Sequence, residues 1–262
     1  MNKWFAGLVT GMLLLSMTSP LMAQEVVVLS GLDETIAWFE EQGFWGEKEN
    51  AERLDVPRAL IVAISERWRK TAEKLPVETK KKIFYRFMLP LVMHANTMVL
   101  DRRERLQRMQ DTIDKGGALK EADESWLRQI GVLLRITDSD KADQPMDSAA
   151  LGKMIDQALY KLDIIPPGLA LGQAAYESGY GTSRFAVEGN ALFGQWTFGG
   201  EGLVPEQQRS SLGDHRIASF EWPFDSVRGY FINLSAHPAY ENFRRIRAEY
   251  RSKGKALKSL AL

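Results

Sequence analysis

A regular series of apolar residues between positions 83 and 113 is the strongest constraint on the fold of this chain. Apolar side chains recur there every three or four residues, which is the period of one face of an α-helix. They are Ile83, Phe84, Phe87, Leu91, Ala95, Met98, Val99, Leu106, Met109 and Ile113. Pro90 should kink the helix, because proline has no amide proton and its ring crowds the preceding turn. Gly116 and Gly117 follow and should end it.

The same spacing predicts shorter helices elsewhere before residue 164. They lie near 33–43, 57–75, 126–134 and 147–162. Asp33 and Asp147 are suited to cap two of these helices, and Pro57 to open another.

Other residues in this part of the chain have structural interpretations. The mixed charges of Asp101–Arg105 indicate a solvated, salt-bridged face. His94, alone among apolar residues, is expected to be packed or capped. Four tryptophans are expected to be core anchors: Trp38, Trp45, Trp68 and Trp126.

Composition excludes several classes of protein. Hydrophobic residues are 45% of the 262 residues and charged residues 26%, which is typical of a folded chain and not of a disordered one. The 34 basic and 34 acidic residues leave no basic excess, which disfavours nucleic-acid binding. The absence of cysteine excludes thiol nucleophiles, cysteine metal ligands and disulfides. His215 and His237 lack metal-ligand spacing, so we expect neither a metal nor another cofactor.

The N-terminal residues 1–23 have the pattern of a secretory signal peptide. Lys3 precedes an apolar run from Trp4, and Ala23 provides a small residue at a cleavage point. The run is short for a bilayer span of about 20 residues, so we expect no integral membrane span after cleavage. Export without cysteine favours the periplasm or cell envelope of a bacterium.

The mature chain is expected to divide into two regions. Residues 24–163 form a helical N-terminal region, in which we see no catalytic group and whose protein partner is unknown. Residues 164–262 are richer in glycine, and glycine-rich turns are where sites are commonly built.

The stretch from 166 to 196 contains the most informative carboxylate. Pro166 and Pro167 should start a helix and Gly179 should end it, which places Glu177 in the last turn. The partial negative charge there disfavours an exposed carboxylate by about 0.3–1 kcal/mol. That field and partial desolvation are expected to raise the pKa of Glu177, as a general acid requires. The alternative is an exposed glutamate in a frayed turn.

Two motifs resemble a known family. Residues 173–181, QAAYESGYG, and residues 190–194, NALFG, resemble the signature of glycoside hydrolase family 73, with Tyr180 at its aromatic position and Ala191 inserted. These are glucosaminidase domains of bacterial cell-wall hydrolases, and the whole chain looks most like the Bax-type relatives of Gram-negative bacteria. The resemblance implies a mainly α protein: a lysozyme-like helical domain over 164–262 with a small β-hairpin lobe. It also implies an endo-β-N-acetylglucosaminidase acting on peptidoglycan glycan strands.

The resemblance also implies site residues. Glu177 matches the catalytic acid, and a second carboxylate is expected on the β lobe. Glu206 is preferred because it follows the strand seed Leu203–Val204, with Glu201 as the alternative. The family commonly has threonines where this chain has Val204–Pro205. The substrate-binding candidates are Tyr180, Asn190, Phe193, Trp196, Glu201 and Tyr240.

Several alternatives stay open at this point. Trp196 and Tyr240 could instead be core residues. A lytic transglycosylase is the nearest rival activity, although Ala191–Gly194 stands where those enzymes carry a Gly-Leu-Met-Gln type of motif. A non-catalytic wall-binding or partner-binding module is the alternative of another class.

Two further expectations concern the lobe and the C-terminus. We expect Glu206 to lie far from Glu177 without substrate, which leaves room for a water or for attack by the substrate's acetamido group. The basic stretch Arg244–Lys258 suits either a solvated helix or an anionic surface. Family members continue beyond Leu262 through a closing helix, so one interpretation is an incomplete C-terminus.

Overall fold

The computed structural model describes residues 25–29, 31–46, 56–61, 66–141, 144–197, 202–204, 216–255 and 257. The helices of these ranges are α1 (Leu32–Glu41), α2 (Glu66–Ala72), α3 (Val77–Asp114), α4 (Glu121–Leu133), α5 (Ser148–Lys161), α6 (Pro167–Ser178), α7 (Arg184–Gly189), α8 (Pro223–Ala236), the 3-10 turn η2 (Pro238–Tyr240) and α9 (Glu241–Ser252). The strands are β1 (Glu25–Val27), β2 (Ala59–Ile61), β3 (Trp196–Thr197), β4 (Gly202–Leu203) and β5 (Arg216–Ala218). The predicted signal peptide, 1–23, lies outside them.

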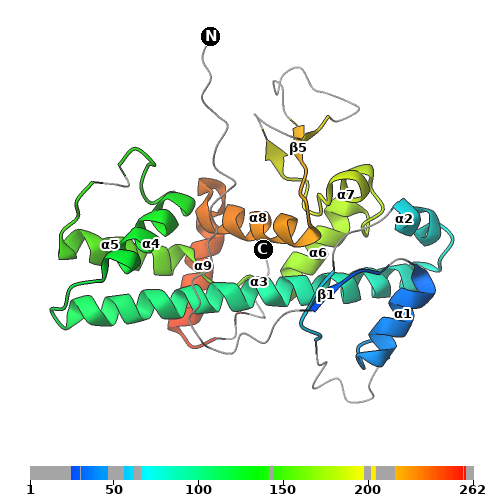
Figure 1. Cartoon of the computed structure of the whole chain (residues 1–262), viewed down its shortest axis with the longest axis horizontal. Helices are drawn as coiled ribbons and strands as arrows, with labels where there is room; N and C mark the ends of the chain where they lie inside the picture. The colour runs from blue at the N-terminus through cyan, green and yellow to red at the C-terminus, as the bar shows by residue number, and fades with distance from the viewer. Residues whose placement is uncertain are drawn as a thin grey trace, which may run out of the picture.

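Helix α3 is the central element of the fold and runs across the whole width of the molecule (Figure 1). The expected long helix is confirmed, and its 38 residues continue through Pro90. Helices α5, α6 and α8 pack against it, so one apolar core continues from the N-terminal region into the C-terminal one. By length and composition alone α3 could also cross a membrane, but in this fold its apolar residues form that core.

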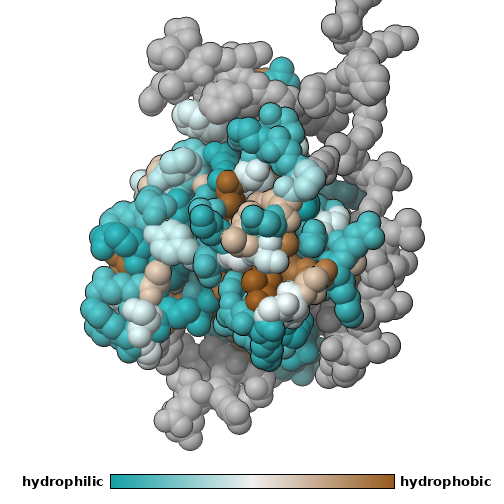
Figure 2. Space-filling view, turned by 90° about the vertical axis from the view of Figure 1, so that its left-hand side faces the viewer, coloured by the Kyte–Doolittle hydropathy of each residue, from teal (hydrophilic) through white to brown (hydrophobic). Residues whose placement is uncertain are grey.

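Helices α4 and α5 lie together at one end of α3 (Figure 1). This end of the molecule presents mostly hydrophilic side chains, with the most apolar ones gathered mainly near the middle of the face (Figure 2). Asp147 caps α5 as predicted, because its side chain accepts a hydrogen bond from the Ala150 amide at 2.8 Å. The four tryptophans are partly buried against the core, as expected.

Two expectations for the first part of the chain are wrong. Residues Ala59–Ile61 form strand β2, paired in parallel with β1, where a helix opened by Pro57 was expected. The backbone groups of this apolar run form hydrogen bonds with β1, which is distant in the sequence. The helical spacing of apolar residues gives no sign of such a partner. Asp33 lies in the first turn of α1 and makes no capping hydrogen bond, because Gly31 is the N-cap.

A small antiparallel sheet stands beside the helices. Strand β5 lies between β3 and β4, with Ile217 opposite both Trp196 and Leu203. Gly202 is required in this sheet, because an added Cβ would lie 2.8 Å from the Ile217 carbonyl oxygen. The fold is therefore mainly α and lysozyme-like, with a small β lobe, as the family resemblance implied.

A buried carboxylate joins the helices at the junction of the two regions. Asp163 is 3% exposed. It forms a two-pronged ion pair with Arg251 of α9, and Arg103 of α3 approaches its carboxylate to 3.7 Å. Arg247 of α9 donates to the Asp163 carbonyl at 3.0 Å, and burial lowers the pKa of this arginine to about 10.

These contacts correct two interpretations of charged stretches. Arg103, in the stretch expected to be solvated, is buried and donates to the carbonyls of Leu159 and Leu162 at 2.5 and 2.6 Å. Arg244 and Arg247 are each 1% exposed, so α9 is not simply a solvated basic helix. The arginines are buried because carbonyl oxygens at the ends of other helices accept their hydrogen bonds.

We expect Asp163→Asn to lower the free energy of unfolding by about 2–3 kcal/mol, because it leaves Arg103 and Arg251 without a charged partner. Urea unfolding followed by circular dichroism measures the change. Asp138→Asn is the control, since it removes an exposed pair with Lys141 and should cost less than about 1 kcal/mol. Equal losses in the two variants would contradict the assignment.

Candidate functional site

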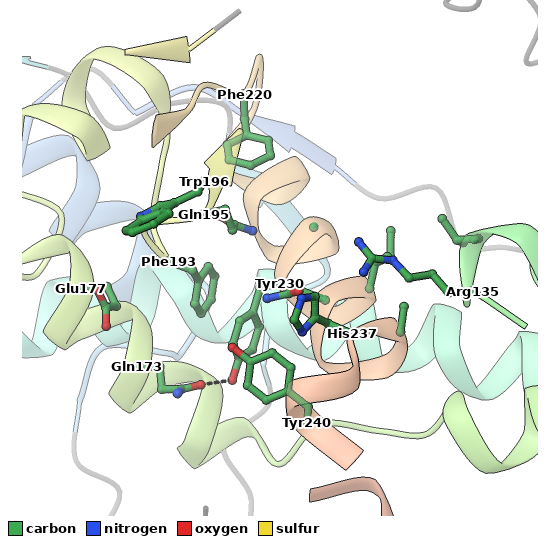
Figure 3. Close-up of a pocket in the computed structure, with 16 residues that line it drawn as sticks. Arg135, Gln173, Glu177, Phe193, Gln195, Trp196, Phe220, Tyr230, His237 and Tyr240 are labelled. Atoms are coloured by element: carbon green, nitrogen blue, oxygen red, sulfur yellow. Dashed lines mark hydrogen bonds between the residues drawn. The ribbon is translucent and has the colours of Figure 1, made fainter. Parts of the chain in front are cut away.

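A cavity of about 670 Å³ lies between α6, the start of the β lobe and α8 (Figure 3). Its volume is in the range of small-molecule sites in proteins. It is lined by Leu133, Arg135, Gln173, Glu177, Phe193, Gly194, Gln195, Trp196, Phe220, Gly229, Tyr230, Ile232, Asn233, Ala236, His237 and Tyr240. Glu177 and Arg135 lie at opposite ends of this group in the view (Figure 3).

Glu177 is placed at the cavity by the end of helix α6. Pro167 opens this helix and Gly179 ends it in the left-handed conformation, with φ of 57°, as the sequence predicted. The Glu177 side chain is exposed, and no side chain in the described part of the molecule forms an ion pair or hydrogen bond with it. Tyr176 is 86% exposed, so it does not shield the carboxyl group as expected.

Gly194 makes room for this carboxylate. Its φ is +57°, and a Cβ added there would lie 3.3 Å from Oε2 of Glu177. The last residue of the second motif therefore lies close to the carboxylate of the first. This close approach gives a physical reason for the pairing of the two motifs.

The wall beside Glu177 is built from stacked aromatic rings. Phe193 stacks on Tyr230 of α8, with ring centroids 4.0 Å apart and an interplanar angle of 9°. The Tyr230 hydroxyl donates a hydrogen bond to Gln173 of α6 (Figure 3). Burial raises the pKa of Tyr230, and the neighbouring Tyr240 raises it further, so this hydroxyl stays protonated.

Gln195 holds the start of the β lobe against α8. Its amide nitrogen donates to the Ser226 carbonyl at 2.8 Å, and its amide oxygen accepts from the Ser226 hydroxyl at 3.0 Å. The Gln195 carbonyl accepts from the Ala218 amide of β5 at 2.8 Å. Trp196, the next residue, is half exposed at the edge of the cavity.

The structure brings together some of the predicted site residues. Glu177, Phe193, Trp196 and Tyr240 all line the cavity. Glu201 and Glu206 lie outside the described residues, so their place and their distance from Glu177 stay predictions.

Two predicted binding residues lie away from the cavity lining. Tyr180 packs edge-on against Phe84 and Tyr85 of α3, at 5.7 and 6.0 Å between ring centroids. Asn190, with φ of 49°, donates to the carbonyls of Phe220 and Glu221 at 3.1 and 3.0 Å. These contacts hold the fold, and a substrate role for either residue stays a prediction.

Several lining residues were not predicted as part of the site. They are Gln173, Gln195, Tyr230, Asn233, His237 and Arg135. Gln173 lies one helical turn before Glu177, and this spacing could have indicated it. Arg135 comes from the region in which no functional group was expected, and no local pattern indicates it.

The cavity combines one carboxylic acid and one arginine with neutral polar and aromatic groups. Glu177 is the one carboxylic acid among the described lining residues. Within the described ranges, no three histidine or carboxylate side chains come together as a metal site would require. The arrangement around Glu177 suits proton transfer to a bound molecule that stacks on aromatic rings.

The fold is mainly α and lysozyme-like, and its cleft holds one carboxylic acid beside aromatic residues. Residues 152–260 match the model of the glucosaminidase family, described as mannosyl-glycoprotein endo-beta-N-acetylglucosaminidase. The match begins within α5.

Among curated proteins, the chain is similar to "Protein bax" of Escherichia coli (strain K12), with 35% identity over 104 residues. The aligned part is 40% of this chain and 36% of the relative, so the match spans about a third of that protein. No solved structure matches the chain significantly. The family resemblance carried by the two motifs is confirmed.

We expect Gly194→Ala to lower the free energy of unfolding by about 1 kcal/mol, because alanine is strained at positive φ. Its Cβ should also displace the Glu177 carboxylate. Thermal unfolding and a crystal structure of the variant measure the two effects.

Gly172→Ala is the matched control for this substitution. Gly172 lies on α6, and a Cβ there meets nothing within 4 Å, so alanine should stabilise the helix by about 0.5–1 kcal/mol. A Gly194→Ala variant as stable as the Gly172→Ala variant would contradict the proposed strain.

Proposed function

We propose that this protein is a peptidoglycan hydrolase, an endo-β-N-acetylglucosaminidase that cleaves β-1,4 glycosidic bonds of cell-wall glycan strands. Glu177 is the general acid, which protonates the leaving-group oxygen as the glycosidic bond breaks. Glycan strands are the partner, and the periplasm or envelope is the compartment. The protein takes no metal or organic cofactor in this mechanism.

The observation that carries this proposal is the position of Glu177. It stands at a cavity edged by Phe193, Trp196 and Tyr230, within a segment that matches the glucosaminidase family. The half-exposed ring of Trp196 is available to stack on the apolar face of a sugar ring, whereas Phe193 and Tyr230 are buried and form part of the cavity wall. Neutral amide groups such as that of Gln173 suit hydroxyl and acetamido groups. The carboxyl group of Glu177 has no hydrogen-bond partner among the described residues, so it is free to donate a hydrogen bond to the glycosidic oxygen of the substrate.

The second step needs a water or an internal nucleophile. We propose Glu206 as the base that activates the water, with Glu201 as the alternative. The substrate's own acetamido group is the other route, and Tyr240 is placed at the cavity where it could orient that group.

We expect Glu177→Gln to reduce hydrolysis of purified peptidoglycan by about 10²–10⁴-fold while the fold is retained. Glu188→Gln is the matched control: Glu188 is an exposed carboxylate on the neighbouring helix α7, paired with Arg184 and outside the cavity. Release of soluble fragments measures activity, and circular dichroism checks the fold. Near-normal turnover by Glu177→Gln would remove Glu177 from the mechanism.

Mass spectrometry of the fragments tests the bond and the reaction type. New reducing N-acetylglucosamine ends support the proposal. Anhydro-muramyl ends would instead identify a lytic transglycosylase. Binding without new ends would identify a non-catalytic wall-binding module.

We expect Glu206→Gln to reduce turnover about 10²-fold or more if a water is activated by this residue. The same assay on Glu201→Gln is the comparison. A loss confined to Glu201→Gln moves the base to Glu201. Full activity in both variants would leave the acetamido route as the mechanism.

A further inference from the structure

We propose that Arg135 binds a carboxylate of the substrate at the end of the cavity opposite Glu177. This inference rests on the proposed function and deepens it. It names the preferred substrate as a glycan that carries carboxylates, from lactyl groups or from stem peptides, rather than an uncharged one. The binding residue comes from outside the segment that matches the family.

The backbone at Arg135 favours glycine over arginine. Arg135 follows the end of α4 with φ of +52°, in the left-handed region. Its amide donates to the Val132 carbonyl at 3.0 Å, and the Ile136 amide donates to the Gly131 carbonyl at 2.8 Å. This pair of hydrogen bonds is the Schellman motif, in which glycine is the usual residue at this position. An arginine here is therefore strained, and such outliers occur at functional sites.

The local fold does not use the guanidinium group. Lys161 completes the helix end, because its amine donates to the Leu134 and Arg135 carbonyls at 2.7 and 3.1 Å. The Arg135 side chain is exposed, and in the described part of the molecule no ion pair or hydrogen bond of its guanidinium is formed. Its role is therefore not explained by packing or by pairing.

The electric field around Arg135 favours an anion. Burial lowers the pKa of Lys161, and the charges of Arg244 and Arg135 lower it further. The nearby carboxylates are already engaged: Glu241 by Tyr160 and Arg244, and Asp138, which lines a neighbouring pocket with Arg135, by Lys141. A substrate carboxylate at this end of the cavity can therefore form an ion pair with Arg135.

The cavity itself presents Arg135 to a ligand. The side chain extends from the end of α4 toward the cavity, with His237 and Tyr240 between it and the α6 side in the view (Figure 3). Arg135 is the one lysine or arginine among the described lining residues. A guanidinium group matches a carboxylate with two parallel hydrogen bonds, whereas an uncharged sugar offers no such partner.

The test measures binding in the full chain carrying Glu177→Gln, so that no probe is consumed. The probes are peptide-bearing glycan strands, strands stripped of their peptides by an amidase, and the uncharged oligomer chitohexaose. Arg135→Gly removes the guanidinium and suits the backbone. Arg245→Ala is the charge-matched control, because Arg245 is exposed on α9 and outside the cavity.

We expect Arg135→Gly to weaken binding of carboxylated strands about tenfold more than binding of chitohexaose. Tm should rise by about 2 °C as the strain is released. Arg135→Lys should restore part of the selectivity, and Arg245→Ala should leave it unchanged. A loss only on the stripped strands assigns the lactyl carboxylate, because in peptide-bearing strands that group is joined to the peptide as an amide. A loss only on peptide-bearing strands assigns a stem-peptide carboxylate, and losses on both show that Arg135 binds either carboxylate.

Equal weakening for all three probes, or no weakening, would overturn the inference. A failure of the proposed function is seen separately. If the unsubstituted protein releases no fragments from peptidoglycan, the hydrolase proposal fails, while the ratio of dissociation constants still tests Arg135.

Discussion

The buried carboxylate of Asp163 is the interaction on which the arrangement of helices depends. It follows α5 directly, faces Arg103 of α3, and pairs with Arg251 of α9. One carboxylate therefore connects three helices that lie far apart in the sequence. Burial of so many charged groups is costly unless their donors find acceptors, and here backbone carbonyls accept further hydrogen bonds from Arg103 and Arg247.

The elements predicted from the sequence are those whose signals are local. The apolar period of α3, the Asp147 cap of α5, and the Pro167 start and Gly179 end of α6 each depend on neighbouring residues. Strand β2 was mistaken for a helix because its partner, β1, is distant in sequence. The burial of Arg244 and Arg247 was not predicted for the same reason, since their acceptors belong to other helices.

The residues of the candidate site also divide into those that local sequence patterns predict and those that they do not. Glu177 and Phe193 could be predicted as site residues because they belong to sequence motifs. The close approach of Gly194 to Glu177 gives a physical reason for the two motifs to occur together. Arg135 could not be predicted as a site residue, because only the folded structure brings it to the cavity. Tyr180 and Asn190 belong to the same motifs, yet they stabilise the turns that carry the site. A sequence motif can therefore contain both residues that line the candidate site and residues that stabilise the backbone around it.

The continuity of the core has a consequence for how the family match should be understood. Residues 152–260 are the segment that matches the family model, but α3, which supplies the surface on which α6 and α8 pack, lies outside that segment. The matched segment and the folded body therefore have different boundaries. In this chain the apolar faces of α6 and α8 are covered by a helix that the family model does not include.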